Sequence, residues 1–163
     1  MEVEVGMKIK KATFAAGCFW HIEEEFRMME GVKSTTVGYT GGKTDNPTYK
    51  DVCSDRTGHA ESIEIIFDPK KISYSELLEK FWEIHNPTTL NRQGLDFGIQ
   101  YRSAIFYHDE KQKKEALDSK QKLQKTVKYQ NKKIVTEIVK ASKFFKAEDY
   151  HQKYLLKRGR TTC

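Results

Sequence analysis

Cys18 occupies the position in this sequence where a thiol is best placed to do chemistry. It lies in the segment Gly17-Cys18-Phe19-Trp20, directly after residues 10–16, which have the composition of a strand. Apolar residues then recur at spacings of three and four, which predicts an amphipathic helix. A thiolate in the first turn of a helix meets unpaired backbone N–H groups and the positive end of the helix dipole, which lowers the thiol pKa. The alternative is a buried, inert cysteine, and position alone does not decide between the two.

Two large aromatic side chains, Phe19 and Trp20, follow the cysteine directly. Side chains at successive positions cannot share one face of a helix. One ring can therefore pack inward while the other lines a pocket beside Cys18, although both could equally be core residues. A pocket with aromatic walls and a thiolate at its base suits a small apolar group attached to an electrophilic centre.

Glu61 has the residue type and placement of a general acid. Residues 60–67, AESIEIIF, alternate like a strand and place Glu61 on the same face as Ile63 and Ile65. Loss of hydration on an apolar face disfavours the charged carboxylate and raises its pKa, which makes proton donation near pH 7 feasible. The alternative is a carboxylate at a strand end that pairs with a lysine.

These residues belong to a series of ordered blocks that covers most of the chain. The blocks are GCFW at 17–20, Tyr49, VCS at 52–54, TGHAE at 57–61, HNPT at 85–88, NRQG at 91–94, Asp96, Gly98, QYRS at 100–103, His151-Gln152 and Tyr154-Leu155. In sequence and spacing they resemble the peptide methionine sulfoxide reductase A family. A lone GCFW segment would be a weak signal, whereas this many blocks in order is a specific one.

The resemblance implies a reaction in which a thiol reduces methionine sulfoxide, free or in proteins, to methionine. Cys18 would attack the sulfoxide sulfur and leave as a sulfenic acid. Phe19 and Trp20 would hold the methyl group of the substrate. Glu61 would protonate the sulfoxide oxygen, which agrees with the raised pKa expected from its strand position. Oxidised proteins with methionine in unfolded or mobile segments would be the natural partners.

Further residues take their roles from the resemblance alone. Tyr49 and Tyr101 would donate hydroxyl hydrogen bonds to the sulfoxide oxygen, and Asp96 would hold water and set the local polarity. His59, two residues before the acid, is expected to make structural hydrogen bonds. Asp55 stands where the family commonly has glycine.

The sulfenic acid on Cys18 must return to a thiol in the second half of the reaction. A second cysteine can condense with it to a disulfide, which an external dithiol then opens. The resemblance implies that Cys163 is this resolving cysteine, that Cys53 is structural, and that a thioredoxin-type dithiol is the reductant. No metal, flavin or nucleotide cofactor is expected, because the sequence has no glycine-rich phosphate loop and its histidines are scattered.

The elements that must position these residues alternate between strand and helix. The pattern predicts helices that start at Cys18, at a capping box of Ser73 with Glu76, and at Asp109, and strands at 10–16, 32–39, 60–67, 101–107 and 134–139. Such interleaving indicates an α/β or α+β fold, and the resemblance implies a two-layer sandwich with a mixed sheet, ferredoxin-like.

Two finer expectations concern the surface of this fold. The stretches 40–58 and 85–100 are rich in turn residues and are predicted to be loops. The acidic triplet Glu23, Glu24 and Glu25 is predicted to lie on the outward face of the first helix.

The composition restricts the compartment and the partners. A chain of 163 residues suits one domain, 1–163, and its three cysteines are too few and too far apart for a secreted disulfide framework. No apolar run approaches the roughly 18–20 residues that span a bilayer, and residues 1–11 lack the apolar stretch of a signal peptide. We therefore expect a cytoplasmic protein with no membrane association, monomeric by default.

Two other functions fit parts of the sequence. A peroxide-reducing thiol enzyme would need a small polar pocket around Cys18 and would leave Glu61 without a role. The net charge of +6 raises the question of an RNA-binding module. The lysines between 111 and 133 are typical of a solvated helix face, however, and no nucleic-acid signature accompanies them, so no nucleic-acid partner is expected.

Overall fold

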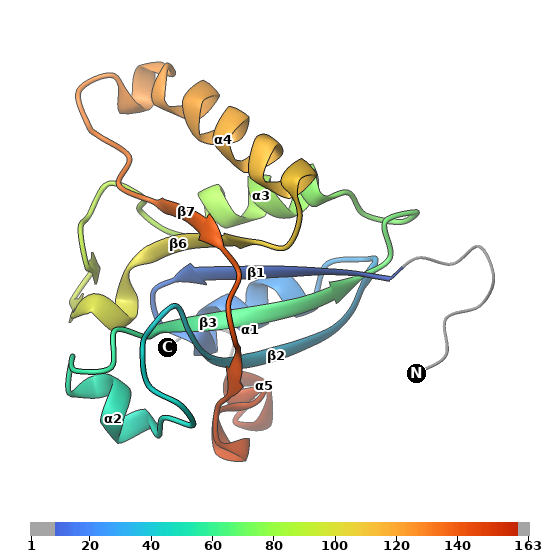
Figure 1. Cartoon of the computed structure of the whole chain (residues 1–163). Coiled ribbons are helices and arrows are strands. Elements are labelled where there is room, and N and C mark those ends of the chain that lie inside the picture. Colours follow the sequence, from blue (N-terminus) through green and yellow to red (C-terminus); the bar gives the residue numbers. More distant parts are fainter. Residues whose placement is uncertain (1–8, 160–163) are drawn as a thin grey trace.

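The strands predicted from the sequence all belong to one sheet (Figure 1). The structure, a computed structural model, describes residues 9–159, and these form a six-stranded sheet in the order β7-β6-β1-β3-β2-β8. Its strands are β1 (Lys10–Ala16), β2 (Val32–Thr40), β3 (Ala60–Phe67), β6 (Ser103–Tyr107), β7 (Glu137–Lys140) and β8 (Phe145–Lys146). The β6–β7 pair is parallel and the other neighbours are antiparallel, so the prediction of a mixed sheet is confirmed.

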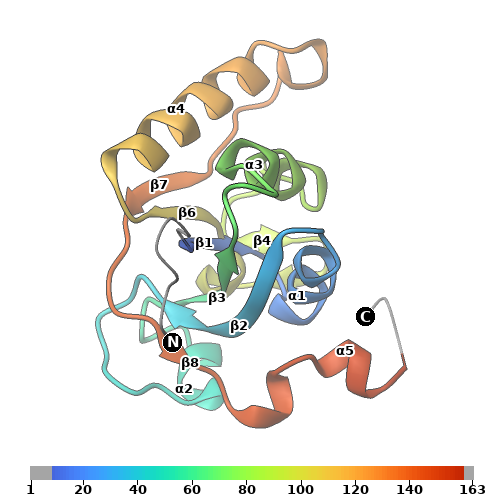
Figure 2. The same cartoon turned by 90° about the vertical axis from the view of Figure 1, so that its right-hand side faces the viewer.

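Three helices cover one face of this sheet (Figure 2). They are α1 (Phe19–Arg27), α3 (Tyr74–Glu83) and α4 (Glu110–Gln124). The shorter elements are α2 (Tyr49–Cys53), α5 (Tyr154–Lys157), the hairpin of β4 (Arg92–Gln93) with β5 (Asp96–Phe97), and the 3-10 turns η1 (Ile99–Tyr101), η2 (Val127–Tyr129) and η3 (Asp149–His151). The predicted loops at 40–58 and 85–100 therefore contain α2 and the β4–β5 hairpin.

Alternation along the strands builds the core between the sheet and the helices. Phe14 of β1 and Ile63 of β3 point to the helical face and belong to the same buried cluster as residues of α1, α3 and α4. The ring of Phe14 stacks against Phe26 of α1 at 5.5 Å and against Phe81 of α3 at 5.1 Å between centroids. This aromatic stack fixes α1, and with it the residues at its start, against β1.

The helix boundaries follow the capping signals of the sequence. Ser73 and Glu76 form the predicted capping box before α3, and the Asp109 side chain accepts from the Gln112 backbone N–H at the start of α4. Along the chain, β1, α1, β2, β3, α3 and β6 follow in that order. The finer label, ferredoxin-like, and the extent of the domain stay predictions. Within residues 9–159, no helix is long and apolar enough to cross a membrane.

The prediction that the acidic triplet of α1 faces outward is wrong for two of its three residues. Glu23 and Glu24 are buried, while Glu25 is partly exposed. Glu24 accepts two hydrogen bonds from the Arg27 guanidinium, at 2.6 and 2.8 Å. Glu23 accepts a hydrogen bond from Lys153 in the C-terminal segment, by which we mean residues 147–159 after β8. This segment packs along the side of α1 that an isolated amphipathic helix would expose to water.

Candidate active site

Cys18 caps the N-terminus of α1, as the sequence predicted. Its backbone is non-helical (φ −59°, ψ 120°), and its carbonyl accepts the first hydrogen bond of the helix, from the Ile22 N–H at 3.4 Å. Gly17, which separates it from β1, has a φ of 95°. A β-carbon at Gly17 would lie 2.8 Å from the Gln93 side chain, so glycine is needed both for the turn and for the approach of the hairpin.

Glu61 lies beside the first turn of α1 with its carboxyl group buried. It is 1% exposed, and its Oε1 accepts from the Phe19 backbone N–H at 3.3 Å. Its Oε2 is buried without a hydrogen-bond partner among the described residues. The pKa of Glu61 is raised to about 8, mainly by burial and also by the Asp96 carboxylate, while the Phe19 N–H and the Tyr101 hydroxyl act in the opposite direction. Near neutral pH the group can therefore hold a proton and donate it.

Tyr49 and Tyr101 are half-buried and lie within electrostatic reach of Glu61. Burial raises the pKa of both hydroxyls, and the Glu61 carboxylate raises the pKa of each further. Each phenol therefore stays protonated and can donate a hydrogen bond at any physiological pH. Asp96 is exposed on β5 and acts on the pKa of both Glu61 and Tyr101, so the hairpin brings it to the same place.

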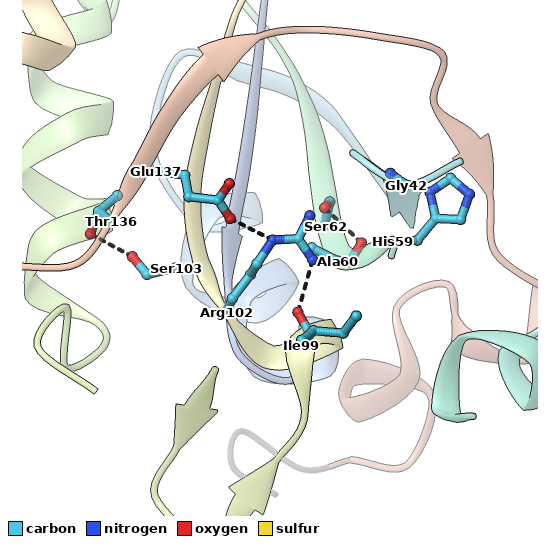
Figure 3. Close-up of polar contacts among 9 residues, drawn as sticks. All are labelled: Gly42, His59, Ala60, Ser62, Ile99, Arg102, Ser103, Thr136 and Glu137. Atoms are coloured by element: carbon cyan, nitrogen blue, oxygen red, sulfur yellow. Dashed lines mark hydrogen bonds and ion pairs between the residues drawn. The ribbon is translucent and has the colours of Figure 1, made fainter. Parts of the chain in front are cut away.

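Polar contacts at the start of β6 hold the turn that carries Tyr101 (Figure 3). Arg102 lies between two partners, donating to the Glu137 carboxylate at 2.7 Å and to the Ile99 carbonyl at 2.9 Å. Next to it, the Ser103 and Thr136 hydroxyls hydrogen-bond at 2.7 Å. These contacts tie the η1 turn and the start of β6 to Thr136 and Glu137, at the start of the neighbouring strand β7, and so restrict Tyr101.

Glu148 anchors Tyr49 from the other side. One carboxylate oxygen accepts from the Tyr39 hydroxyl at 2.8 Å, and the other accepts from the Tyr49 backbone N–H at 3.0 Å. Burial opposes the charge on Glu148, but these hydrogen bonds, with one from its own backbone N–H and the nearby His151, together outweigh burial and lower its pKa. The first residue of α2 is therefore held to the C-terminal segment.

Phe19 and Trp20 separate as the sequence suggested. Phe19 is fully buried in the core, whereas Trp20 is partly exposed. The Trp20 indole N–H donates to Nδ1 of His151 at 2.9 Å, and its ring stacks on Tyr154 with centroids 3.7 Å apart and planes 5° from parallel. The Arg158 guanidinium lies over the other side of this stack, 3.7 Å from the Tyr154 centroid.

His151 and Tyr154 are therefore site residues to which sequence reasoning assigned no role. His151 is 0% exposed, and its ring also contacts Phe19 and Tyr49, with centroids 5.1 and 4.6 Å away. Burial lowers its pKa, which keeps the ring neutral and its Nδ1 an acceptor for Trp20. The contact joins residues 131 positions apart, so no local pattern could reveal it.

The model of the peptide methionine sulfoxide reductase family matches residues 10–163 of the chain. The chain belongs to this family. The peptide methionine sulfoxide reductase MsrA of Methanosarcina acetivorans is 59% identical to it over 154 residues, which cover 94% of this chain and 81% of that protein.

Solved structures with this fold include one of Mxr1 from Saccharomyces cerevisiae in its reduced form. It superposes with a TM-score of 0.87 at 38% identity and covers 97% of this chain and 93% of that one. A second structure, Mxr1 in complex with Trx2, gives a TM-score of 0.66 at 29% identity and covers 94% of this chain and 89% of that one.

Asp55, at the position where the resemblance implies a glycine, has a backbone that glycine favours. Asp55 has a φ of 63°, in the left-handed region. Aspartate is among the few other residues that visit this region routinely. The substitution therefore preserves the turn after α2. His59 has the structural role expected of it, since its ring accepts from the Gly42 N–H at 3.0 Å and contacts the Thr44 carbonyl at 2.7 Å (Figure 3 shows Gly42 and His59).

The other two cysteines of this reductase differ in what the structure shows. Cys53 ends α2, is exposed and is not in a disulfide. Partial burial of its thiol raises its pKa, the Tyr49 hydroxyl lowers it and Glu61 raises it, so the thiol lies within reach of the site. Cys163 lies outside the described residues. Within residues 9–159, no group of His, Cys, Asp and Glu side chains could hold a metal ion.

Proposed function

We propose that this protein reduces methionine S-sulfoxide, free or in proteins, to methionine, with Cys18 as nucleophile and Glu61 as general acid. One observation carries the proposal: the Phe19 N–H, one residue after the cysteine, donates to Oε1 of the buried Glu61, and within residues 9–159 Oε2 has no hydrogen-bond partner. A proton donor with a pKa of about 8 therefore stands beside a thiol at a helix N-terminus. That pairing suits a reaction in which a nucleophile attacks one atom while an acid protonates the oxygen bonded to that atom.

In the first step the Cys18 sulfur attacks the sulfoxide sulfur while Glu61 protonates its oxygen. The Tyr49 and Tyr101 hydroxyls donate hydrogen bonds to the same oxygen, and Asp96 keeps the surroundings polar. The oxygen then passes to Cys18, so a thiol and a sulfoxide become a sulfenic acid and a thioether. The cysteine sulfur is oxidised by two electrons, and the methionine sulfur is reduced by two.

The methyl group of the substrate lies against Trp20, with Phe19 behind it. Trp20 suits this role because His151 and Tyr154 fix its ring, so an apolar wall is preformed before substrate arrives. Methionine sulfoxide in unfolded or mobile protein segments is the natural substrate class, because only such side chains reach a wall on the protein surface.

In the second step the Cys163 thiol condenses with the sulfenic acid, forming a disulfide and releasing water. A thioredoxin-type dithiol then reduces the disulfide to two thiols and becomes oxidised itself. The complex of the related Mxr1 with Trx2 supports this donor class.

The test compares two oxidants with the reduced protein under the same conditions. We expect a blocked methionine S-sulfoxide to be consumed with a larger kcat/KM than hydrogen peroxide, and its R epimer to be left unchanged. A larger kcat/KM for peroxide would instead identify a peroxide-reducing thiol enzyme. Salt-sensitive RNA binding without any reductase activity would support the binding-module alternative.

A further inference from the structure

Glu23 is a buried carboxyl group that the proposed reaction does not use. It lies on α1, five residues after Cys18, and is 1% exposed. Of the residues in the acidic triplet, Glu25 pairs with Lys80 at 3.6 Å and Glu24 pairs with Arg27 of its own helix. Glu23 makes no salt bridge within residues 9–159. A buried carboxyl group costs stability unless hydrogen bonds compensate it, so its partners indicate what it does.

Two hydrogen bonds connect Glu23 to separate parts of the fold. Oε2 accepts from the Thr35 hydroxyl of β2 at 2.8 Å, and Oε1 accepts a short bond from the Lys153 backbone N–H. Burial raises the pKa of Glu23, and both hydrogen bonds act against that effect. One carboxyl group thus joins α1, β2 and the C-terminal segment.

Lys153 is the turning point of the segment that supports Trp20. It has a φ of 51°, in the left-handed region, and it caps the start of α5. On one side of this turn is His151, which accepts from the Trp20 indole, and on the other side is Tyr154, which stacks on it. The left-handed turn at Lys153 therefore lies between the two residues that contact the Trp20 ring.

A second anchor holds the same segment to the sheet without Glu23. The Gln152 side-chain amide accepts from the Val37 N–H and donates to the Val37 carbonyl, both at 2.9 Å, and it also donates to the Ala147 carbonyl. Loss of Glu23 should therefore leave the segment attached to β2. Without Glu23, however, the Lys153 turn should no longer have a fixed position relative to α1.

We propose that Glu23 is a positioning residue, which sets the aromatic wall at Trp20 by fixing the Lys153 turn against α1. The inference rests on the proposed function, because it assigns to Trp20 the binding of the substrate's methyl group. Glu23 touches neither substrate nor the reacting atoms in this account. Its effect should appear in substrate binding rather than in the chemical step.

The first experiment measures KM and kcat for a blocked methionine S-sulfoxide in Glu23→Ala, Glu23→Gln and Glu24→Ala. We expect Glu23→Ala to raise KM about tenfold and to change kcat by less than about threefold. Glu23→Gln should stay near the parent, because its amide oxygen can accept from Lys153 while its NH₂ donates to Thr35. Glu24→Ala is the matched control, since it removes a buried carboxyl group of the same helix that does not contact the C-terminal segment.

A second experiment measures the environment of the Trp20 ring by its fluorescence. Trp20 and Trp82 are the two tryptophans of the chain. In a Trp82→Phe background the indole fluorescence reports on Trp20, and Glu23→Ala should shift it while Glu24→Ala should not. Thr35→Val removes the hydroxyl that holds Oε2 of Glu23 and leaves the backbone of the Lys153 turn unchanged. It should raise KM in the same direction as Glu23→Ala, and combining the two should add little.

Distinct results would overturn this inference and the proposed function. If the parent protein reduces no sulfoxide, the proposed function fails. If the parent is active and Glu23→Ala leaves KM and the fluorescence unchanged, or Glu24→Ala raises KM equally, Glu23 has only a structural role. If Glu23→Ala does not fold, Thr35→Val decides, and an unchanged KM in that variant contradicts the inference.

Discussion

One carboxyl oxygen of Glu61 accepts a hydrogen bond from the Phe19 N–H, and the other has no hydrogen-bond partner in the part of the chain that the structure describes. Its pKa of about 8 arises mainly from burial, so the folded protein keeps a proton there that the unfolded chain would release near its usual value of 4.5. This contribution to stability is fully present below pH 4.5 and is lost as the pH rises through about 8. The acid that the reaction needs therefore exists at neutral pH and disappears above it.

The rate of the first turnover should follow that ionisation. In the parent protein we expect the rate constant for methionine formation to fall as the pH rises above about 8. Glu61→Gln should lack this falling limb, because its amide does not ionise, and Glu61→Ala should be slower by a factor of about 100 or more. Stopped-flow measurements over a pH series test this, and an unchanged falling limb in Glu61→Gln would assign it to another group.

Among the site residues, the sequence predicted those whose position follows from the local pattern of strands and helices. The strand-to-helix junction located Cys18, and alternation in 60–67 located Glu61 on the inward face. His151 and Tyr154 gave no such signal, because what brings them to Trp20 is the path of the C-terminal segment along α1. Periodicity predicts which face of a helix is buried against a single neighbour, whereas α1 packs against both the sheet and the C-terminal segment.

Among the elements, the junction of β1 with α1 depends on the β4–β5 hairpin. Gly17 has a positive φ and its α-carbon faces the Gln93 side chain, whose amide in turn holds the 86–93 loop through Asn86. The hairpin was predicted as part of a loop, since two-residue strands are too short to show alternation. The sequence therefore predicted the long strands and capped helices but not the short elements that close the site.

A pair of glycine substitutions tests this junction. Gly17→Ala should cost about 1–3 kcal/mol, because its φ of 95° is strained for alanine and the new methyl group would meet Gln93. Gly94→Ala, with a φ of 57° and no atom within 4 Å, should cost only about 1 kcal/mol. Urea unfolding measures the loss of unfolding free energy in each variant. Equal losses would show that the contact with Gln93 does not contribute to stability.

The cap of α4 offers a change that should separate stability from activity. Asp109→Ala removes the acceptor for the Gln112 N–H, 2.8 Å away, and should cost about 1 kcal/mol. None of the proposed site residues within 9–159 belongs to α4. Thermal unfolding should therefore shift while kcat/KM stays the same, and a matching loss of activity would show that α4 is coupled to the site.

At the scale of the whole molecule, the sheet brings together residues far apart in the chain. Cys18 follows β1, Glu61 lies on β3, Tyr101 precedes β6, and Trp20 meets the segment after β8. The interleaved elements predicted an α/β or α+β fold and the family resemblance predicted a mixed sheet, but the edge strand β8 was not predicted. That strand is only two residues long, and it pairs with β2 through contacts more than 100 positions apart in the sequence.

Recycling is the part of the proposal that involves the whole chain and a partner. We expect Cys163→Ser to keep a normal first turnover and to lose thioredoxin-dependent cycling, because the sulfenic acid would have no resolving thiol. Cys53→Ser should cycle normally and serves as the control. Full cycling by Cys163→Ser would transfer the resolving role to Cys53 or to the donor itself.

The most direct test of the account is a single turnover without any external reductant. Reduced parent protein mixed with excess methionine S-sulfoxide should form at most one methionine per molecule before a reductant is added, with the oxidation located at Cys18 by mass spectrometry. Cys18→Ser should form none. Methionine formation by Cys18→Ser, or oxidation of another residue in its place, would contradict the claim that Cys18 is the nucleophile.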